Sequence, residues 1–248
     1  KIRSEEYVKA DGTAVPLSRS LLLKTLKDVK EFSDYDELLS PIVSEYDQWI
    51  KNLDQQLPSI PKKFTDNKVT DHQINNCVEA KKRISDGIKI ISTNPTAGQA
   101  FQFANEVMYD QMIYSKWAKR NIKNGKVDGD APPISEYEKD GYPSWYVFQL
   151  AYILLNIKSI VEPTSEEGKK EREIVDLLWF PTGGGKTEAY LGIVAFVFAM
   201  RRLREEEPNK YGVNVIMRYT YRLLTQQQFQ RAAALMCACE RKRQKNPK

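Results

Sequence analysis

The sequence places a glycine-rich segment with a lysine and a threonine directly after a short apolar run. Residues 181–187 read Pro-Thr-Gly-Gly-Gly-Lys-Thr, and residues 174–180 read Ile-Val-Asp-Leu-Leu-Trp-Phe. An apolar run of this length indicates a buried strand, and the pattern after Thr187 indicates a helix. Glycines between a strand and a helix let backbone N–H groups approach phosphate oxygens, because no Cβ blocks them. The segment therefore predicts a site for the phosphates of a nucleotide.

Both the side chains and the backbone amides of this segment would take part in binding ATP and Mg²⁺. We expect the Lys186 ammonium to contact the β- and γ-phosphates and the Thr187 hydroxyl to ligate the bridging Mg²⁺, which makes both candidate catalytic residues. The backbone N–H groups around the phosphates would come from the four preceding residues, Thr182, Gly183, Gly184 and Gly185. The alternative is a glycine-rich turn with an incidental lysine, which would bind no nucleotide.

The elements around the segment predict an α/β architecture. Residues 186–205 carry the apolar pattern of a helix buried on most sides, and residues 213–218 form a second short apolar run. A strand, a helix and a second strand form the unit that gives a parallel sheet with a right-handed crossover. Ligands bind at the carboxyl edge of such sheets. We therefore expect residues 181–187 to lie at the edge of a partial parallel sheet.

The first half of the chain predicts helices and carries no catalytic pattern. Apolar residues recur with helical spacing in three stretches, residues 44–57, 72–92 and 94–117. The Asn94-Pro95 pair suits a helix start, because Asn can cap the helix and Pro fits its first position. Gly, Asp, Asn and Pro concentrate in residues 121–133, which is typical of a loop. We predict a helical accessory domain at residues 1–135 and the nucleotide-binding lobe at residues 136–248.

The composition excludes several classes of protein. Of the 248 residues, 41% are hydrophobic and 29% charged, and no apolar run approaches the roughly 20 residues that cross a bilayer. We expect no membrane association and a cytoplasmic location. Three cysteines and one histidine provide neither a disulfide framework nor a zinc site, and we expect Cys237 and Cys239 to be small buried residues on a helix. The net charge of +5 supports nucleic-acid binding only weakly.

The Pro-Thr-Gly-Gly-Gly-Lys-Thr run resembles motif I of the superfamily 2 helicases. The general phosphate-loop pattern has a glycine where this chain has Phe180, and the helicase form omits it. The resemblance implies an ATP-dependent DNA helicase or translocase, with a RecA-like lobe following the helical domain. Upstream, Gln149 resembles the glutamine of the Q motif, whose amide can pair with adenine N6 and N7. The other interpretation of Gln149 is a polar residue on the solvent side of an amphipathic helix at residues 145–157.

A further resemblance follows the second apolar run. Three residues fall where motif Ia of these helicases has Thr, Leu and Gln: Thr220, Leu223 and Gln226. Tyr219, Tyr221 and Arg222 replace the Pro, Arg and Glu of that motif. Hydroxyls and guanidinium groups at a helix start suit DNA phosphates, so the resemblance implies contacts from Arg218, Thr220, Arg222 and Gln226. A polar turn between a strand and a helix is the other interpretation.

Two longer runs, residues 176–192 and 217–232, resemble the DrmA helicases of the DISARM antiphage systems. This resemblance implies a large DNA translocase that works beside a DrmB partner in phage defence. No Asp-Glu pair follows an apolar strand after Thr187, so we expect the carboxylates that activate water to lie elsewhere. The chain begins at Lys1 without a leader and ends in a basic tail, so we expect a fragment of a longer polypeptide.

Two other classes of protein fit the same sequence. One is a phosphate-loop NTPase that acts as a switch or a kinase and never moves along DNA. The other is a protein-binding module in which the helical region docks a partner and the nucleotide is structural. Salt-dependent DNA binding separates the first class from a translocase, and ATP turnover with and without DNA separates the second.

Overall fold

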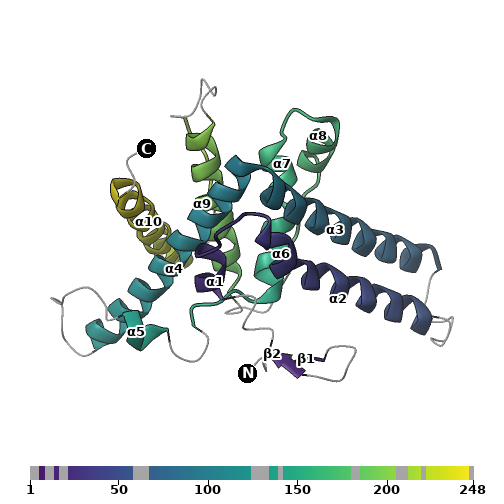
Figure 1. Cartoon of the computed structure of the whole chain (residues 1–248), viewed down its shortest axis with the longest axis horizontal. Coiled ribbons are helices and arrows are strands. Elements are labelled where there is room, and N and C mark those ends of the chain that lie inside the picture. The colour runs from purple at the N-terminus through teal and green to yellow at the C-terminus, as the bar shows by residue number, and fades with distance from the viewer. Residues whose placement is uncertain are drawn as a thin grey trace. The chain divides into compact units, whose positions relative to one another are not determined.

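A computed structural model describes nine stretches of the chain: residues 6–8, 14–16, 22–57, 67–123, 134–138, 142–179, 185–204, 212–218 and 222–245. Helices make up most of these residues (Figure 1). The chain forms two compact units. Unit 1 contains residues 1–29, 99–150 and 179–248, and unit 2 contains residues 30–98 and 151–178. Most helices belong to one unit, whereas α4 (Pro95–Lys123) and α6 (Val147–Leu155) contribute residues to both.

Unit 1 contains a short antiparallel hairpin and most of the helices around the glycine-rich segment. Its elements are β1 (Glu6–Val8), β2 (Ala14–Pro16), α1 (Leu23–Lys27), α5 (Ile134–Tyr137), α9 (Lys186–Leu203), α10 (Arg222–Lys245), most of α4 (Pro95–Lys123) and the first half of α6 (Val147–Leu155). α10 packs against α9. The largest fully buried side chains of the unit include Phe101, Met108, Leu150 and Phe196. The core of unit 1 is therefore helix packed on helix.

Unit 2 is a helical unit in which α2 lies along α3. Its elements are α2 (Asp34–Gln56), α3 (Asn67–Thr93), α7 (Ile157–Val161), α8 (Glu166–Arg172) and the second half of α6. α3 packs against both α2 and α7, and α7 packs against α8. Gly87 of α3 permits a close approach, because a Cβ at that position would lie 2.1 Å from the Leu154 carbonyl oxygen of α6. The apolar faces of α2 and α3 supply the core of this unit.

A buried ion network joins three parts of unit 2. Both terminal nitrogens of Arg83 in α3 donate to Asp176, each at 2.8 Å, and Arg83 Nε lies 3.6 Å from Glu171 Oε2 in α8. The Arg83 side chain is only 5% exposed. Burial alone would lower the pKa of Arg83, but the two carboxylates raise it above its usual value. Burial raises the pKa of Glu171, and the charge of Arg83 opposes that shift. The network fixes the segment that leads toward residues 181–187.

The predicted helices are largely confirmed, although their ends differ. The capped start of α4 is confirmed, because Asn94 Oδ1 accepts a hydrogen bond from the Ala97 N–H at 3.1 Å. α2 begins at Asp34, ten residues before the predicted start, with three acidic residues in its first turn. The predicted helix at residues 145–157 breaks at Asn156 between α6 and α7, and the charged stretch after it contains α8.

The prediction of a parallel sheet in a RecA-like lobe is wrong. Residues 174–179 and 213–218 form no strand, and the described parts of the chain contain a single sheet, the hairpin of β1 and β2. Val175 is 92% exposed and Ile216 is 86% exposed, so neither segment packs as a buried strand. An apolar run shows that a segment suits a sheet, but a strand also needs a neighbour to which its backbone bonds. The Val213 carbonyl instead accepts a hydrogen bond from Arg201 Nη1 at 2.8 Å.

Two smaller expectations are also tested. In the described ranges, we find no helix that combines the length and the apolarity needed to cross a membrane. Cys239 is partly buried, and burial raises its thiol pKa to about 12. Cys237 is exposed, so its predicted burial is wrong. The two residues are two positions apart on α10 and therefore face different directions.

Candidate functional site

The structure describes the last three residues of the predicted phosphate segment. Gly185 has φ 85° and ψ 17°, which is the left-handed region that favours glycine, and it is the N-cap of α9 without a side-chain capping bond. α9 then begins at Lys186, with Thr187 in its first turn and partly exposed. Thr182, Gly183 and Gly184 lie outside the described residues. No side chain at the N-cap therefore occupies the first amides of α9, which are the groups that bind phosphate in such segments.

Gln149 of α6 holds the end of this segment. Its Nε2 donates to the Gly185 carbonyl at 2.7 Å, and its Oε1 accepts from the Tyr146 N–H at 2.8 Å. The residue is only 3% exposed. A Cβ at Gly185 would lie 2.6 Å from Nε2, so both the positive φ and the close amide require glycine here. The structure thus brings together two residues that the sequence analysis singled out separately.

The burial of Gln149 contradicts the interpretation that it lies on the solvent side of its helix. A buried amide with one bond on each polar atom positions backbone rather than projecting into water. The predicted contact with adenine stays a prediction. It would need the second N–H of Nε2 and the second lone pair of Oε1, or an exchange of partners when nucleotide binds.

Glu188 is a residue of the site that the sequence analysis did not identify. It lies in the first turn of α9, where its N–H donates to the Gly185 carbonyl at 3.2 Å. Its carboxylate pairs with the guanidinium of Arg231 on α10. A glutamate directly after Lys186 and Thr187 is visible in the sequence, but only the packing of α9 on α10 shows its partner.

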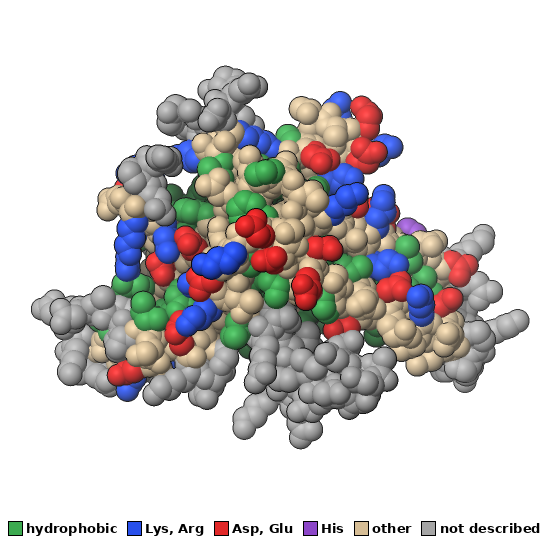
Figure 2. Space-filling view, viewed as in Figure 1, with side chains coloured by type: hydrophobic (Ala, Val, Ile, Leu, Met, Phe, Trp, Pro, Cys, Tyr) green, Lys and Arg blue, Asp and Glu red, His purple; other side chains and the backbone are tan. Residues whose placement is uncertain are grey.

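The residues predicted to contact DNA are described in part. Arg218 is exposed at the end of residues 212–218, and Gln226 is exposed on α10. Arg222 is the first residue of α10, whereas its side chain and the whole of Thr220 lie outside the described residues. In Figure 2, Lys and Arg side chains lie among Asp and Glu side chains over the face in view. With a net charge of only +5, DNA contact would depend on particular residues more than on overall charge.

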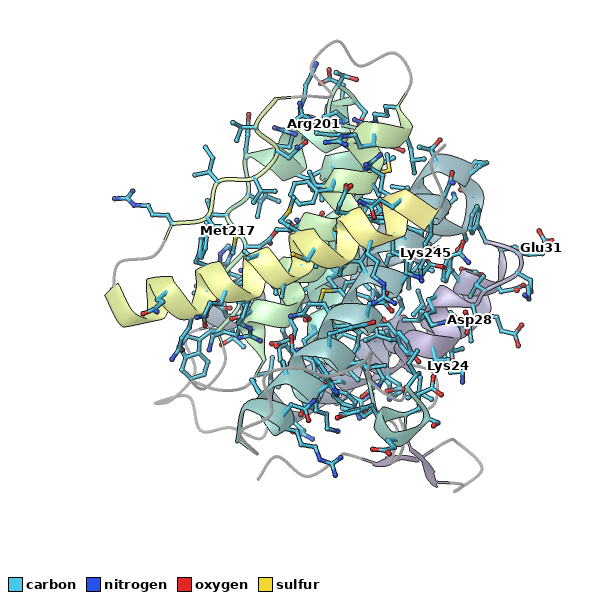
Figure 3. All side chains as sticks on the ribbon, turned by 90° about the vertical axis from the view of Figure 1, so that its left-hand side faces the viewer. Lys24, Asp28, Glu31, Arg201, Met217 and Lys245 are labelled. Carbon is cyan, nitrogen blue, oxygen red and sulfur yellow. The ribbon has the colours of Figure 1, made fainter. Side chains whose placement is uncertain are left out.

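The C-terminal half of α10 and its middle contact two other helices of unit 1. Lys242 lies 3.5 Å from Glu106 of α4, and the Arg241 guanidinium lies over the ring of Tyr114 at 4.7 Å. Figure 3 shows α10 crossing in front of α9. The C-terminal half of α10 is therefore fastened to α4, while its middle contacts α9 through Arg231.

Comparison with known proteins gives one informative similarity. No family model matches the chain. The chain is 36% identical over 255 residues to the DISARM protein DrmA of Bacillus paralicheniformis, and the match spans 97% of this chain and 21% of that protein. The predicted resemblance to DrmA proteins is confirmed. The chain thus spans about a fifth of the length of the relative that it matches.

Proposed function

We propose that this DrmA-like chain binds ATP and Mg²⁺ at residues 181–187 as part of an ATP-dependent DNA helicase or translocase that acts in antiphage defence. One observation carries the nucleotide site: the buried amide of Gln149 holds Gly185 in a left-handed conformation at the start of α9, beside Lys186. The similarity to DrmA supports the role in defence. The proposed phosphate contacts come from the glycine-rich segment and the first turn of α9.

Each residue has a defined role in this proposal. The Lys186 ammonium balances charge on the β- and γ-phosphates, and the amides of residues 182–185 donate hydrogen bonds to their oxygens. Thr187 follows in the first turn of α9, where the residue is partly exposed and its hydroxyl would ligate Mg²⁺. Mg²⁺ held there would supply positive charge that offsets the negative charge of the phosphates. Gln149 holds the Gly185 carbonyl through Nε2 and would contact adenine with its second N–H and the second lone pair of Oε1.

The two roles of Gln149 can be separated by the choice of nucleotide. We expect Gln149→Ala to weaken ATP binding by about 5 to 30 fold, because the Gly185 carbonyl and the Tyr146 N–H lose their partner. Equal weakening for ATP and GTP, measured by titration with fluorescent analogues, indicates that Gln149 positions the segment. A larger loss for ATP indicates adenine contact. Gln227→Ala, an exposed glutamine of α10, is the control, and ATP affinity unchanged by Gln149→Ala contradicts both roles.

We further propose that DNA phosphates contact the residues around the start of α10. Arg218 and Arg222 supply the charge, and Thr220 and Gln226 supply hydrogen-bond donors. The exposure of Arg218 and Gln226 is compatible with this role. A DrmB-like protein is the proposed partner in the defence complex, on the basis of the similarity to DrmA alone.

The salt dependence of DNA binding tests these contacts. Each phosphate contact contributes about 0.9 to the slope of log affinity against log salt concentration for duplex DNA. We therefore expect the double variant Arg218→Ala, Arg222→Ala in the full-length protein to reduce the slope by about 2, as measured by fluorescence anisotropy of a labelled duplex. Arg172→Ala, an exposed arginine of α8, should leave the slope unchanged. An unaltered slope in the double variant would favour an NTPase switch that does not use this surface for DNA.

A further inference from the structure

The carboxylate of Glu188 lies between the glycine-rich segment and α10. One oxygen, Oε1, pairs with Arg231 Nη2, while the other, Oε2, is buried and accepts no hydrogen bond in the described structure. Oε2 lies 3.6 Å from the position that a Cβ on Gly185 would take. The Glu188 side chain is 19% exposed. A negative charge is therefore held beside the backbone that would receive phosphates.

This placement is unfavourable for nucleotide binding unless the charge is balanced. A carboxylate close to a triphosphate repels it, and partial burial strengthens the repulsion. Arg231 supplies the opposite charge and draws the carboxylate toward α10. Burial lowers the pKa of Arg231, yet the guanidinium stays protonated at neutral pH because its ordinary value is so high. The pair thus permits an acidic residue to stand next to a phosphate site.

Arg231 lies in the middle of α10, so its pairing with Glu188 connects α10 to the first turn of α9. Arg231 lies about two and a half turns after Arg222, where the proposed DNA contacts begin. The other end of α10 is fastened to α4 by Lys242 and Arg241. Because these contacts lie in the middle and the C-terminal half of α10, a change at Arg231 would act on the part of the helix that precedes them.

We propose that the Glu188–Arg231 pair is the link through which nucleotide at residues 181–187 alters the affinity of the α10 start for DNA. Both are positioning residues: phosphate at the segment repels Glu188, changes its hold on Arg231 and shifts the first turns of α10. This inference rests on the proposed function and adds to it the route of coupling between the two ligands. Coupling of this kind is reciprocal, so DNA must alter nucleotide affinity by the same factor.

The test measures DNA affinity of the full-length protein with and without AMP-PNP and Mg²⁺. We expect the wild-type protein to show a ratio of the two DNA dissociation constants of about 5 or more, and Arg231→Gln and Glu188→Gln to bring that ratio close to 1. Arg243→Gln is the matched control on α10, since Arg243 pairs only with exposed Glu240 in the described structure, and it should keep the wild-type ratio.

A second readout separates a charge effect from simple loss of structure. Arg231→Gln leaves the Glu188 carboxylate unbalanced, so AMP-PNP affinity should fall by about 5 to 10 fold. Adding Glu188→Gln to that variant should restore the affinity, whereas a merely structural role predicts a further loss. Glu188→Gln alone keeps the side-chain volume and remains informative if Arg231→Gln fails to fold.

The outcomes distinguish failure of the inference from failure of the proposed function. The coupling route alone is overturned if nucleotide binding depends on Lys186 but the wild-type ratio of the two DNA dissociation constants is near 1. It is also overturned if Arg231→Gln and Glu188→Gln keep the full wild-type ratio. A wild-type protein that binds no AMP-PNP overturns both. Restored affinity in the double variant with lost coupling in each single variant supports the link.

Discussion

Replacing Lys186 by alanine is expected to weaken ATP binding by about 10 to 150 fold, because the substitution removes a charge-assisted contact of roughly 1.5 to 3 kcal/mol. Lys186 is the first residue of α9, directly after the left-handed Gly185. The measurement is equilibrium titration of the full-length variant with a fluorescent ATP analogue in the presence of Mg²⁺. This is the largest effect on binding that a single side chain of the site should produce.

The control for this prediction is Lys89→Ala, which removes an exposed lysine of α3. It should leave ATP affinity within experimental error of the wild-type value. Thermal unfolding of both variants checks that neither change disturbs the fold. ATP affinity that is the same in Lys186→Ala as in the wild-type protein would remove the basis for a phosphate site at residues 181–187.

Replacing Arg83 by alanine is expected to cost about 3 to 5 kcal/mol of unfolding free energy. The side chains of Arg83 and Glu171 are 5% and 9% exposed, and that of Asp176 is 19% exposed, so the substitution leaves two carboxylates partly or fully buried without their counter-ion. Burial already raises the pKa of Glu171, and loss of Arg83 removes the stronger of the two influences that oppose this shift, the positive charges of Arg83 and Lys158. Urea unfolding followed by circular dichroism measures the effect.

Two further variants define the cause of this loss. Arg172→Ala removes an exposed arginine of α8 and should change stability by less than about 0.5 kcal/mol. Arg83→Lys keeps the charge but lacks the fork that donates twice to Asp176, so its cost should fall between the other two. A loss below about 1 kcal/mol for Arg83→Ala would show that the network is not a main support of unit 2.

The helices could be predicted from the sequence because their signals are local. Periodic apolar residues and the Asn94 cap define α4, and the same pattern defines most of α3 and α9. The ends were less certain, and Pro41 illustrates why: it lies inside α2, although proline usually marks a helix boundary. The parallel sheet was predicted wrongly because pairing between strands is not local and composition alone does not show it. Residues 174–179 and 213–218 have the composition of strands and yet find no partner strand.

The candidate site shows the same division between local and distant information. The glycine at position 185 and the lysine after it were recognisable from their spacing. Gln149 makes two hydrogen bonds to backbone atoms, and one of them depends on where α6 lies against the start of α9. The spacing of residues in the sequence does not reveal that placement. The Glu188–Arg231 pair joins residues that are far apart in the sequence, and either side chain alone has the appearance of a solvated charge.

The alternatives to a translocase lead to different results in one comparison. A DNA translocase hydrolyses ATP faster when DNA is present, whereas an NTPase switch has turnover that DNA does not change. A protein-binding module with a structural nucleotide shows no turnover under either condition. The assay requires the full-length protein, since this chain spans about a fifth of the DrmA protein that it matches.

The central claim is that a triphosphate binds at residues 181–187, next to the start of α9. An experimental structure of the full-length protein with AMP-PNP and Mg²⁺ tests it most directly. We predict phosphate oxygens within hydrogen-bond distance of Lys186 Nζ and of the backbone N–H groups of residues 182–187, with Gln149 still bonded to the Gly185 carbonyl. A nucleotide bound elsewhere, or a turn filled by neighbouring side chains with no space for an anion, would contradict the account.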